Sequence, residues 1–295
     1  MSVPLPRLFE GMSRTVIVGV AMILATSATI QLAAAVAHDL FGQVGAAGTS
    51  ALRFALGAAI IVVVVRPSVR GRDGATWRAI AAYGISLAAL NITFFEAIDR
   101  LPMGIAVTFA FIAPLVMALA GSRRRRDVAF ALLAGSGVVA LGGIERPESI
   151  AGMAFAVASG CAWAAVAYTG RSVGQRTRSV DGLALAIPVA CIVTLPLGAG
   201  HLGAVDGRAL VLGLVIAVGG LIVPFALELE GLRRLEPRLV AVIYSVDPAI
   251  AALVGLVALS ENLTLPQAVG MTAVMVASAG ATAAAGSGAA ASRST

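Results

Sequence analysis

Three ionisable side chains lie inside long apolar stretches of this 295-residue sequence: Arg53, Glu228 and Asp247. An ionisable group in apolar surroundings costs free energy unless it is paired or faces water, so such groups often serve binding or proton transfer. Arg53 is either a carboxylate-binding or gating residue, or an arginine that secures helix packing through backbone carbonyls or a nearby acid. Glu228 is either a substrate-binding or proton-carrying group, or a helix-end acid paired with Arg233 or Arg234. The expected chemistry is reversible binding of charge.

Neutral polar and aromatic residues in the same stretches are candidates for the wall of a binding cavity. Trp163 and Tyr168 are either interfacial belt residues or cavity residues, and the position of Trp163 well inside its stretch favours a cavity wall. Phe109 and Phe111 are expected in the core or against lipid. The remaining candidates for substrate binding or coupling are Gln31, Asn91 and Tyr244.

The residue types that catalysis or a bound metal would need are missing at useful spacing. His38 and His201 fall in predicted external loops, and no pair of histidines or acids has the spacing of metal ligands on a helix. The chain has no lysine, so a phosphate-binding loop of the Gly-Lys-Ser/Thr type is absent. Cys161 and Cys191 lie in apolar stretches, which favours a packing role. We therefore expect no enzyme activity, no cofactor and no metal.

The composition predicts the class of protein. Hydrophobic residues make up 59% of the chain, charged residues 12%, and the mean hydropathy is +0.96. A soluble domain carries about 25% charged residues, and a helix needs about 20 apolar residues to cross a bilayer. Ten stretches approximate this length: 16–36, 43–65, 78–98, 103–121, 127–144, 150–171, 182–199, 209–229, 239–259 and 266–285. The predicted fold is an all-α membrane protein with ten transmembrane helices.

Prolines interrupt two of these stretches. Pro248 comes directly after Asp247, and Pro114 stands in the fourth stretch. A proline within a helix removes one backbone donor and frees a carbonyl upstream, which predicts a helix kink at each position. Irregular backbone at membrane depth is tolerated mainly where it lines a cavity, so both kinks are placed beside a central site. The alternative is a packing kink, with Asp247 near the external surface.

The basic residues predict the orientation of the chain. All 21 are arginines; with a cytoplasmic N-terminus, 17 fall in cytoplasmic segments and three in external segments, while Arg53 lies within a span. Basic loops are retained on the cytoplasmic side, so we expect a multi-pass protein of the cell (inner) membrane with both termini cytoplasmic. The run from Arg123 to Arg126 then lies beside the membrane, and no nucleic-acid partner is expected.

Two parts of the sequence resemble each other at a spacing of 134 residues. Seven of the 26 positions from 96 to 121 are identical to their mates in 230–255, among them Glu96 with Glu230 and Pro114 with Pro248. Ten spans divide into two sets of five, and an odd number per set inverts the second half relative to the first. The predicted divisions are a cytoplasmic N-terminus (1–15), a first five-helix repeat (16–144), a second five-helix repeat (150–285) and a cytoplasmic tail (286–295). At the same spacing, Arg53 pairs with Ile187 and Glu228 with Phe94, so each of these charges belongs to one half only.

Several short motifs resemble those of the EamA-type branch of the drug/metabolite transporter superfamily. The matching segments are Val44 to Gly48, Ala51 to Arg53, Leu101 to Val107, Ala162 to Ala164, Asp247 to Ala249 and Ser260 to Thr264. Within that branch the sequence is most similar to the bacterial inner-membrane threonine/homoserine exporters, over roughly residues 25–285. The resemblance implies ten helices, two EamA-like five-helix repeats and proton-linked efflux of small metabolites. It also assigns Glu228 to the acid of the eighth span.

Three positions depart from the pattern of those exporters. Ala110 and Asp247 stand where they usually carry glutamate, and Val166 stands where they usually carry tyrosine. The absence of an acid at Ala110 removes one partner for an amino group and puts amino-acid specificity in doubt.

Three functions follow from these patterns. The leading expectation is a proton-coupled secondary exporter of amino acids such as threonine or homoserine. The alternatives are efflux of a broader range of hydrophobic or cationic compounds, and a membrane protein that transports nothing. The expected partners are a small-molecule substrate and the lipid bilayer, with a homodimer possible.

Overall fold

The computed structural model describes residues 14–113, 125–142, 149–177, 179–232, 234–235 and 237–291, and within them it contains helices and no strand. The α-helices are α1 (Arg14–Val65), α2 (Gly74–Ile98), α3 (Met103–Ala110), α5 (Arg125–Gly142), α6 (Ile150–Arg176), α7 (Ser179–Gly198), α8 (Gly207–Ala217), α9 (Val223–Leu232), α10 (Pro237–Tyr244), α11 (Asp247–Ala258) and α12 (Leu265–Ala291). A 3₁₀ helix, η2 (Ala199–Ala204), precedes α8, and a π helix, η3 (Val218–Ile222), joins α8 to α9. The prediction of an all-α protein is confirmed.

Helix α1 is two helices that meet at a sharp reversal. Its 52 residues would extend about 78 Å if straight, far more than one bilayer crossing. The chain instead turns at Gly45, whose φ of 67° lies in the left-handed region that glycine adopts without strain. The Thr49 hydroxyl donates to the Gly45 carbonyl oxygen at 2.8 Å and stabilises the turn. The reversal therefore lies inside the stretch predicted for the second span, because the first helix continues through the expected loop.

Several helices have the length and composition of membrane spans. Among the described residues, five segments are long and apolar enough to cross a bilayer: 14–65, 74–98, 150–176, 180–204 and 207–228. Large apolar side chains such as Val64, Ile192 and Val257 are exposed on the outside of the bundle. Such exposure is costly in water and favourable in lipid, which agrees with the membrane class expected from composition.

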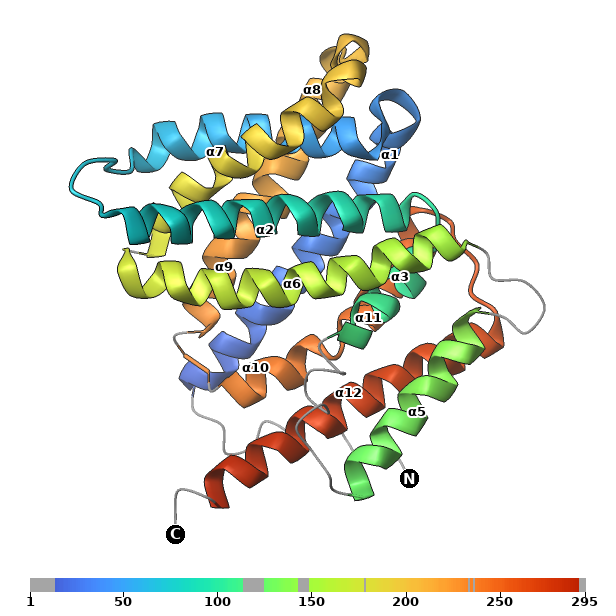
Figure 1. The fold of residues 1–295 in the computed structure, drawn as a ribbon. Coiled ribbons are helices and arrows are strands. Elements are labelled where there is room, and N and C mark those ends of the chain that lie inside the picture. Colours follow the sequence, from blue (N-terminus) through green and yellow to red (C-terminus); the bar gives the residue numbers. More distant parts are fainter. Residues whose placement is uncertain are drawn as a thin grey trace.

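The helices pack in pairs at very short distances. Helix α2 lies along α6, and α5 lies along α12, as Figure 1 shows; α1 also packs against α7, and α3 against α11. Glycine makes the closest approaches possible. A Cβ atom added to Gly160 would lie 2.0 Å from the Ala110 carbonyl oxygen, and one added to Gly84 would lie 2.5 Å from the Ala186 carbonyl oxygen. These contacts bring backbones of separate helices together, as expected for small residues in membrane proteins.

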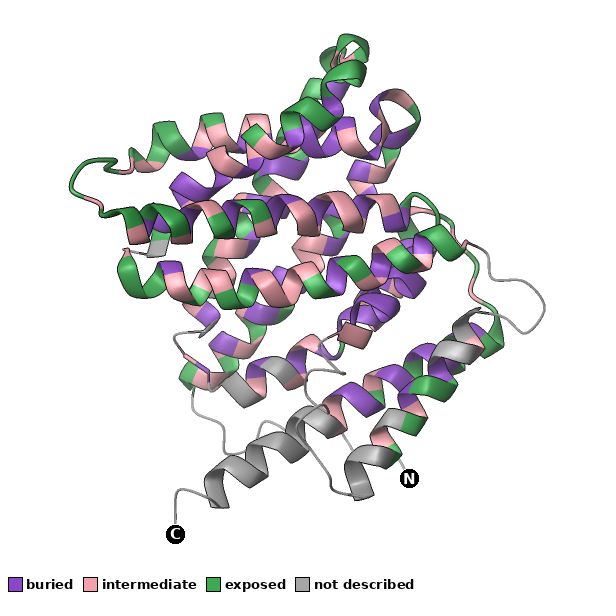
Figure 2. Cartoon of the chain, viewed as in Figure 1, coloured by how far each residue is buried: buried purple, intermediate pink, exposed green. Residues whose placement is uncertain are grey.

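The apolar core surrounds α3, the short helix at the centre of the bundle. All eight residues of α3 are buried, and Figure 2 shows this helix buried along its length. Helix α3 ends at Ala110, and the ninth predicted span is broken between Tyr244 and Asp247, where α10 ends and α11 begins. The described backbone thus contains helix ends in its middle as well as at its surface.

Side chains at helix N-termini satisfy free backbone N–H groups. The Asp73 carboxylate accepts from the Thr76 N–H at 2.9 Å, and the Asp206 carboxylate accepts from the Ala209 N–H at 2.7 Å. Hydrogen bonds from the side chain and backbone of Thr76 lower the pKa of Asp73. The hydrogen bond from the Ala209 N–H, followed by one involving Gln43, lowers the pKa of Asp206. Both carboxylates therefore stabilise the starts of α2 and α8 in their ionised form.

Candidate functional site

Glu228 on α9 and Tyr244 at the end of α10 are joined by a hydrogen bond. The Tyr244 hydroxyl donates to Glu228 Oε1 at 2.7 Å, a normal length for an O–H···O bond. The alternative expected for Glu228 was a pair with one of the following arginines. Arg234 instead pairs with Glu230, with 2.6 Å between Nη2 and Oε1, while Arg233 lies outside the described residues. The side chain of Glu228 is therefore directed to the interior aromatic group.

Three aromatic rings form a row that ends at Glu228. The Phe111 and Trp163 ring centroids are 5.3 Å apart, and those of Trp163 and Tyr244 are 5.6 Å apart, with nearly perpendicular planes. Edge-to-face pairs of this kind are favourable and fix the orientation of each ring. The residues come from the end of α3, the middle of α6 and the end of α10. Sequence reasoning placed Phe111 in the core or against lipid; its position three residues before Pro114 was the signal that could have associated it with the site.

Asp247 opens α11 directly after the helix break, and Pro248 lies in the first turn of that helix. The Asp247 side chain is only 9% exposed, which disagrees with the alternative that placed it near the external surface. Its carboxyl group lies beside Ser27 of α1 and within electrostatic range of Glu228. Among the described residues, neither Asp247 Oδ1 nor Ser27 Oγ has a hydrogen-bond partner that meets normal geometry. The break therefore presents a buried acid with spare acceptor capacity.

Arg53 lies on the second limb of α1 and contacts backbone and an aromatic ring. Its Nη2 donates a short hydrogen bond to the Gly220 carbonyl oxygen in η3, and its Cζ lies 5.6 Å from the centroid of the Phe95 ring. The buried Nε has no partner in the described part of the chain. Two further predicted residues, Gln31 and Asn91, are 4% and 7% exposed, and each has a side-chain oxygen without a hydrogen-bond partner there.

Two predicted residues are not brought into this cluster. Tyr168 is 80% exposed on α6, on a different side of the helix from Trp163. Pro114 lies outside the described residues, so the structure does not address the kink predicted there. Within the described ranges, no group of three or more histidine, cysteine or acidic side chains could hold a metal ion.

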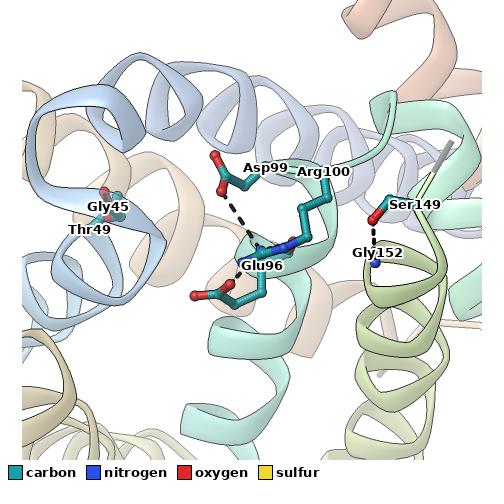
Figure 3. Close-up of polar contacts among 7 residues, drawn as sticks. All are labelled: Gly45, Thr49, Glu96, Asp99, Arg100, Ser149 and Gly152. Atoms are coloured by element: carbon teal, nitrogen blue, oxygen red, sulfur yellow. Dashed lines mark hydrogen bonds and ion pairs between the residues drawn. The ribbon is translucent and has the colours of Figure 1, made fainter.

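A second set of charges lies where the third and fourth predicted spans meet. Arg100 Nη1 is 2.5 Å from Glu96 Oε2 and 3.7 Å from Asp99 Oδ2, and its Cζ lies 5.1 Å from the Phe155 ring centroid. Figure 3 shows Arg100 between these acids, near the start of α6, where the Ser149 hydroxyl accepts from the Gly152 N–H at 3.0 Å. The expected pairing of each repeated acid with the arginine four residues later is thus present for both Glu96 and Glu230.

Known proteins resemble this chain over nearly its whole length. The threonine/homoserine exporter RhtA of Salmonella typhimurium (strain LT2) is 35% identical over 267 residues, which cover 88% of this chain and 90% of the exporter. RhtA of Escherichia coli (strain K12) is 34% identical over 269 residues, which cover 89% and 90% respectively. A protein known from a crystal structure superposes with a TM-score of 0.59 at 22% identity, over 92% of this chain and 97% of that one, which shows a shared fold.

The sequence pattern of the EamA-like transporter family matches residues 150–283. Members of this family and the exporters named above are transporters rather than enzymes, in agreement with the missing catalytic spacing. The motifs that suggested the resemblance, including Arg53 and Asp247, lie in the region aligned with those exporters or in the family match. The identity and the coverage together establish that this chain is a membrane transporter of the EamA-like transporter family.

Proposed function

We propose that this protein exports small amino acids, such as threonine and homoserine, across the cell membrane, and that proton movement through Glu228 drives the export. The observation that carries the proposal is the Glu228–Tyr244 hydrogen bond at the end of the aromatic row. It places an acid among residues from both predicted halves, in a chain 35% identical to threonine/homoserine exporters. An ionised carboxylate at membrane depth is costly, so an acid that binds and releases a proton suits this position.

The proposal includes ten transmembrane helices arranged as two inverted five-helix repeats. Equivalent contacts in the two halves support it. The Arg100 and Leu101 side chains pack on Gly152 of the first helix of the second half; Arg234 and Leu235, their mates 134 residues later, pack on Gly19 of the first helix of the first half. A rotation that exchanges the halves would exchange these two contacts, as an inverted repeat requires.

The same exchange relates whole helix pairs. The third helix of the first half, α2, packs on the first helix of the second half, α6. Its counterpart is the contact of α9 with α1, in which the Thr26 hydroxyl donates to the Pro224 carbonyl oxygen at 3.3 Å. Halves related by an axis in the membrane plane would satisfy both contacts, whereas an axis along the membrane normal would not invert the second half.

The proposed orientation has both termini in the cytoplasm, because 17 of the 21 arginines then lie on that side and three outside. Fusions of a reporter that is active only outside the cytoplasm are expected to be silent at Ser2 and at Thr295. A signal from either terminus contradicts the ten-span arrangement.

One observation favours a second candidate, efflux of cationic or hydrophobic compounds. The row of Phe111, Trp163 and Tyr244 presents aromatic surface beside the acids Glu228 and Asp247, a combination that also attracts organic cations. Comparing uptake of labelled threonine with uptake of a labelled quaternary amine by inside-out vesicles separates the two candidates.

Glu228→Gln tests the coupling role. With threonine as the substrate, inside-out vesicles carrying this variant are expected to lose most uptake per inserted molecule and to lose its dependence on the proton gradient. The matched control is Glu230→Gln on the same helix; it breaks the pair with Arg234 and is expected to reduce folded yield while leaving normalised, proton-dependent uptake intact. Full normalised activity of Glu228→Gln with unchanged pH dependence removes Glu228 from the mechanism.

A further inference from the structure

Arg53 is a cation at the centre of the bundle without an acidic partner. Within the described residues, no carboxylate lies within ion-pair distance of its guanidinium; the acids Glu228 and Asp247 interact with Tyr244 and Ser27 instead. Structural arginines in apolar surroundings are usually paired, because an unpaired charge there is costly. The local charge of the folded chain therefore favours an anion beside Arg53.

The hydrogen bonds of Arg53 leave most of its donors for another molecule. A guanidinium has five N–H donors arranged to bind a carboxylate through two parallel bonds. One of them, on Nη2, reaches the Gly220 carbonyl oxygen, and the buried Nε is without a partner among the described residues. The face of the guanidinium is covered by the Phe95 ring, which holds its plane without using any N–H group.

The Gly220 carbonyl is accessible because the helix is irregular at that point. Residues 218–222 form a π turn, in which the backbone hydrogen bonds shift by one residue relative to an α-helix; such turns often occur at functional sites. Gly220 also lacks a side chain: an added Cβ atom would lie 2.8 Å from the Ala33 Cβ atom and 3.3 Å from Arg53 Nη2. Arg53 is thus held by a single carbonyl that it can exchange for a stronger, charged acceptor.

Acceptors for the other end of an amino acid lie on the neighbouring helices. Asn91 stands one helical turn before Phe95 on α2, and Gln31 stands two residues before Ala33 on α1. Both side chains are more than nine-tenths buried, with an oxygen that has no partner in the described part of the chain. A buried acceptor without a donor is destabilising, and an ammonium or hydroxyl group of a ligand would satisfy it.

We propose that Arg53 binds the carboxylate of the exported substrate through paired hydrogen bonds, with the Gly220 carbonyl as its alternative acceptor. The inference rests on the proposed export function and makes it more specific: the substrates are small molecules that carry a carboxylate. Amines without a carboxylate are then poor substrates, in contrast to the second candidate function.

The first test uses the wild-type protein and needs no variant. Inside-out vesicles are loaded with labelled L-threonine as the transported probe, and homoserine and threoninol are compared as competitors, since threoninol carries an alcohol in place of the carboxylate. Homoserine is expected to compete, and threoninol to compete at least about tenfold more weakly, the usual effect of losing hydrogen bonds to a charged group. Equal competition by the two compounds overturns the inference.

The variants Arg53→Gln and Arg53→Lys then assign the effect to this residue. Arg53→Gln is expected to raise the threonine concentration for half-maximal uptake at least about tenfold and to abolish the preference for homoserine over threoninol. Arg53→Lys keeps the charge without the paired donors and is expected to fall between the two. The control Arg208→Gln removes an exposed arginine and should match the wild type. Wild-type threonine affinity in Arg53→Gln overturns the inference even if the folded yield falls.

Failure of the export proposal gives a different result, in which wild-type vesicles accumulate neither threonine nor homoserine. The carboxylate inference is then tested on purified protein, by comparing thermal stabilisation by threonine and 2-hydroxybutyrate with that by their amides. Stabilisation by the carboxylates that disappears in Arg53→Gln supports the assignment. Equal stabilisation by the amides, or no stabilisation by any of these compounds, overturns it.

Discussion

Replacing Tyr244 by phenylalanine removes one hydroxyl group and leaves the ring against Trp163. That hydroxyl donates to Glu228 Oε1 at 2.7 Å, and hydrogen bonds to charged groups contribute about 1.5–3 kcal/mol. If the bond is present in only one of the conformations that the transporter visits, its loss changes their relative free energies by the same amount. Since 1.4 kcal/mol corresponds to a factor of ten, uptake per inserted molecule is expected to fall about 10- to 100-fold.

The matched control for Tyr244→Phe is Tyr168→Phe, which removes the hydroxyl of a tyrosine that is 80% exposed on α6. Threonine uptake by inside-out vesicles, normalised to inserted protein, is measured for both variants at several values of external pH. Tyr168→Phe should retain wild-type uptake. Wild-type uptake by Tyr244→Phe at every pH would refute the argument, because the bond would then be the same in all conformations or absent from the cycle.

Two further predictions concern stability. Gly160→Ala should destabilise the protein by about 1–3 kcal/mol, because the new methyl group would lie 2.0 Å from the Ala110 carbonyl oxygen, whereas Gly174→Ala on the same helix meets no atom within 4 Å and should unfold at or above the wild-type temperature. The lowered pKa values of Asp73 and Asp206 mean that their caps stabilise the fold fully above the ordinary aspartate pKa of 3.8, and that this stability is lost as the pH falls through the lower pKa values of the folded protein. Thermal unfolding of purified protein between pH 2 and 7 should therefore show a smaller loss of stability at low pH in the double variant Asp73→Asn, Asp206→Asn, since asparagine caps a helix without titrating; an unchanged pH profile would contradict this reasoning.

The positions of the helices were largely predictable from the sequence, because span length follows from bilayer thickness and the ends are marked by arginine, proline and glycine. The error at the first reversal has a simple cause. The stretch between residues 36 and 43 looked like a loop, but it contains good helix formers, and only Gly45 adopts the left-handed conformation that reverses the chain. Local helix propensity therefore continued the helix beyond the predicted end of the first span.

The candidate site was predictable by residue type and less so by direction. Glu228, Tyr244 and Trp163 were identified as polar groups in apolar stretches, and the structure brings them together. Tyr168 was selected on the same grounds, yet five residues along a helix correspond to a rotation of about 140° from Trp163. A helix that is apolar on all sides carries no pattern that distinguishes its protein-facing surface from its lipid-facing one, so the direction of each side chain could not be derived.

The irregular turn at residues 218–222 could not be predicted either. Nothing in the sequence Val-Gly-Gly-Leu-Ile requires a π helix, because the turn depends on the approach of Arg53 and Ala33 from another helix. Phe111 was assigned to packing for a related reason: its role depends on Trp163, which is distant in the sequence.

The two charges of the proposed cycle lie on opposite members of the duplicated pair. Arg53 belongs to the first half and Glu228 to the second, and their mates at a spacing of 134 residues are the apolar Ile187 and Phe94. After an ancestral gene was duplicated, divergence at these positions would have removed the energetic equivalence of the two directions of transport. A protein assembled from two copies of either half would carry two arginines and no acid, or two acids and no arginine. The heterogeneity of the halves is thus what allows one scaffold, nearly symmetric in its packing, to favour movement outward.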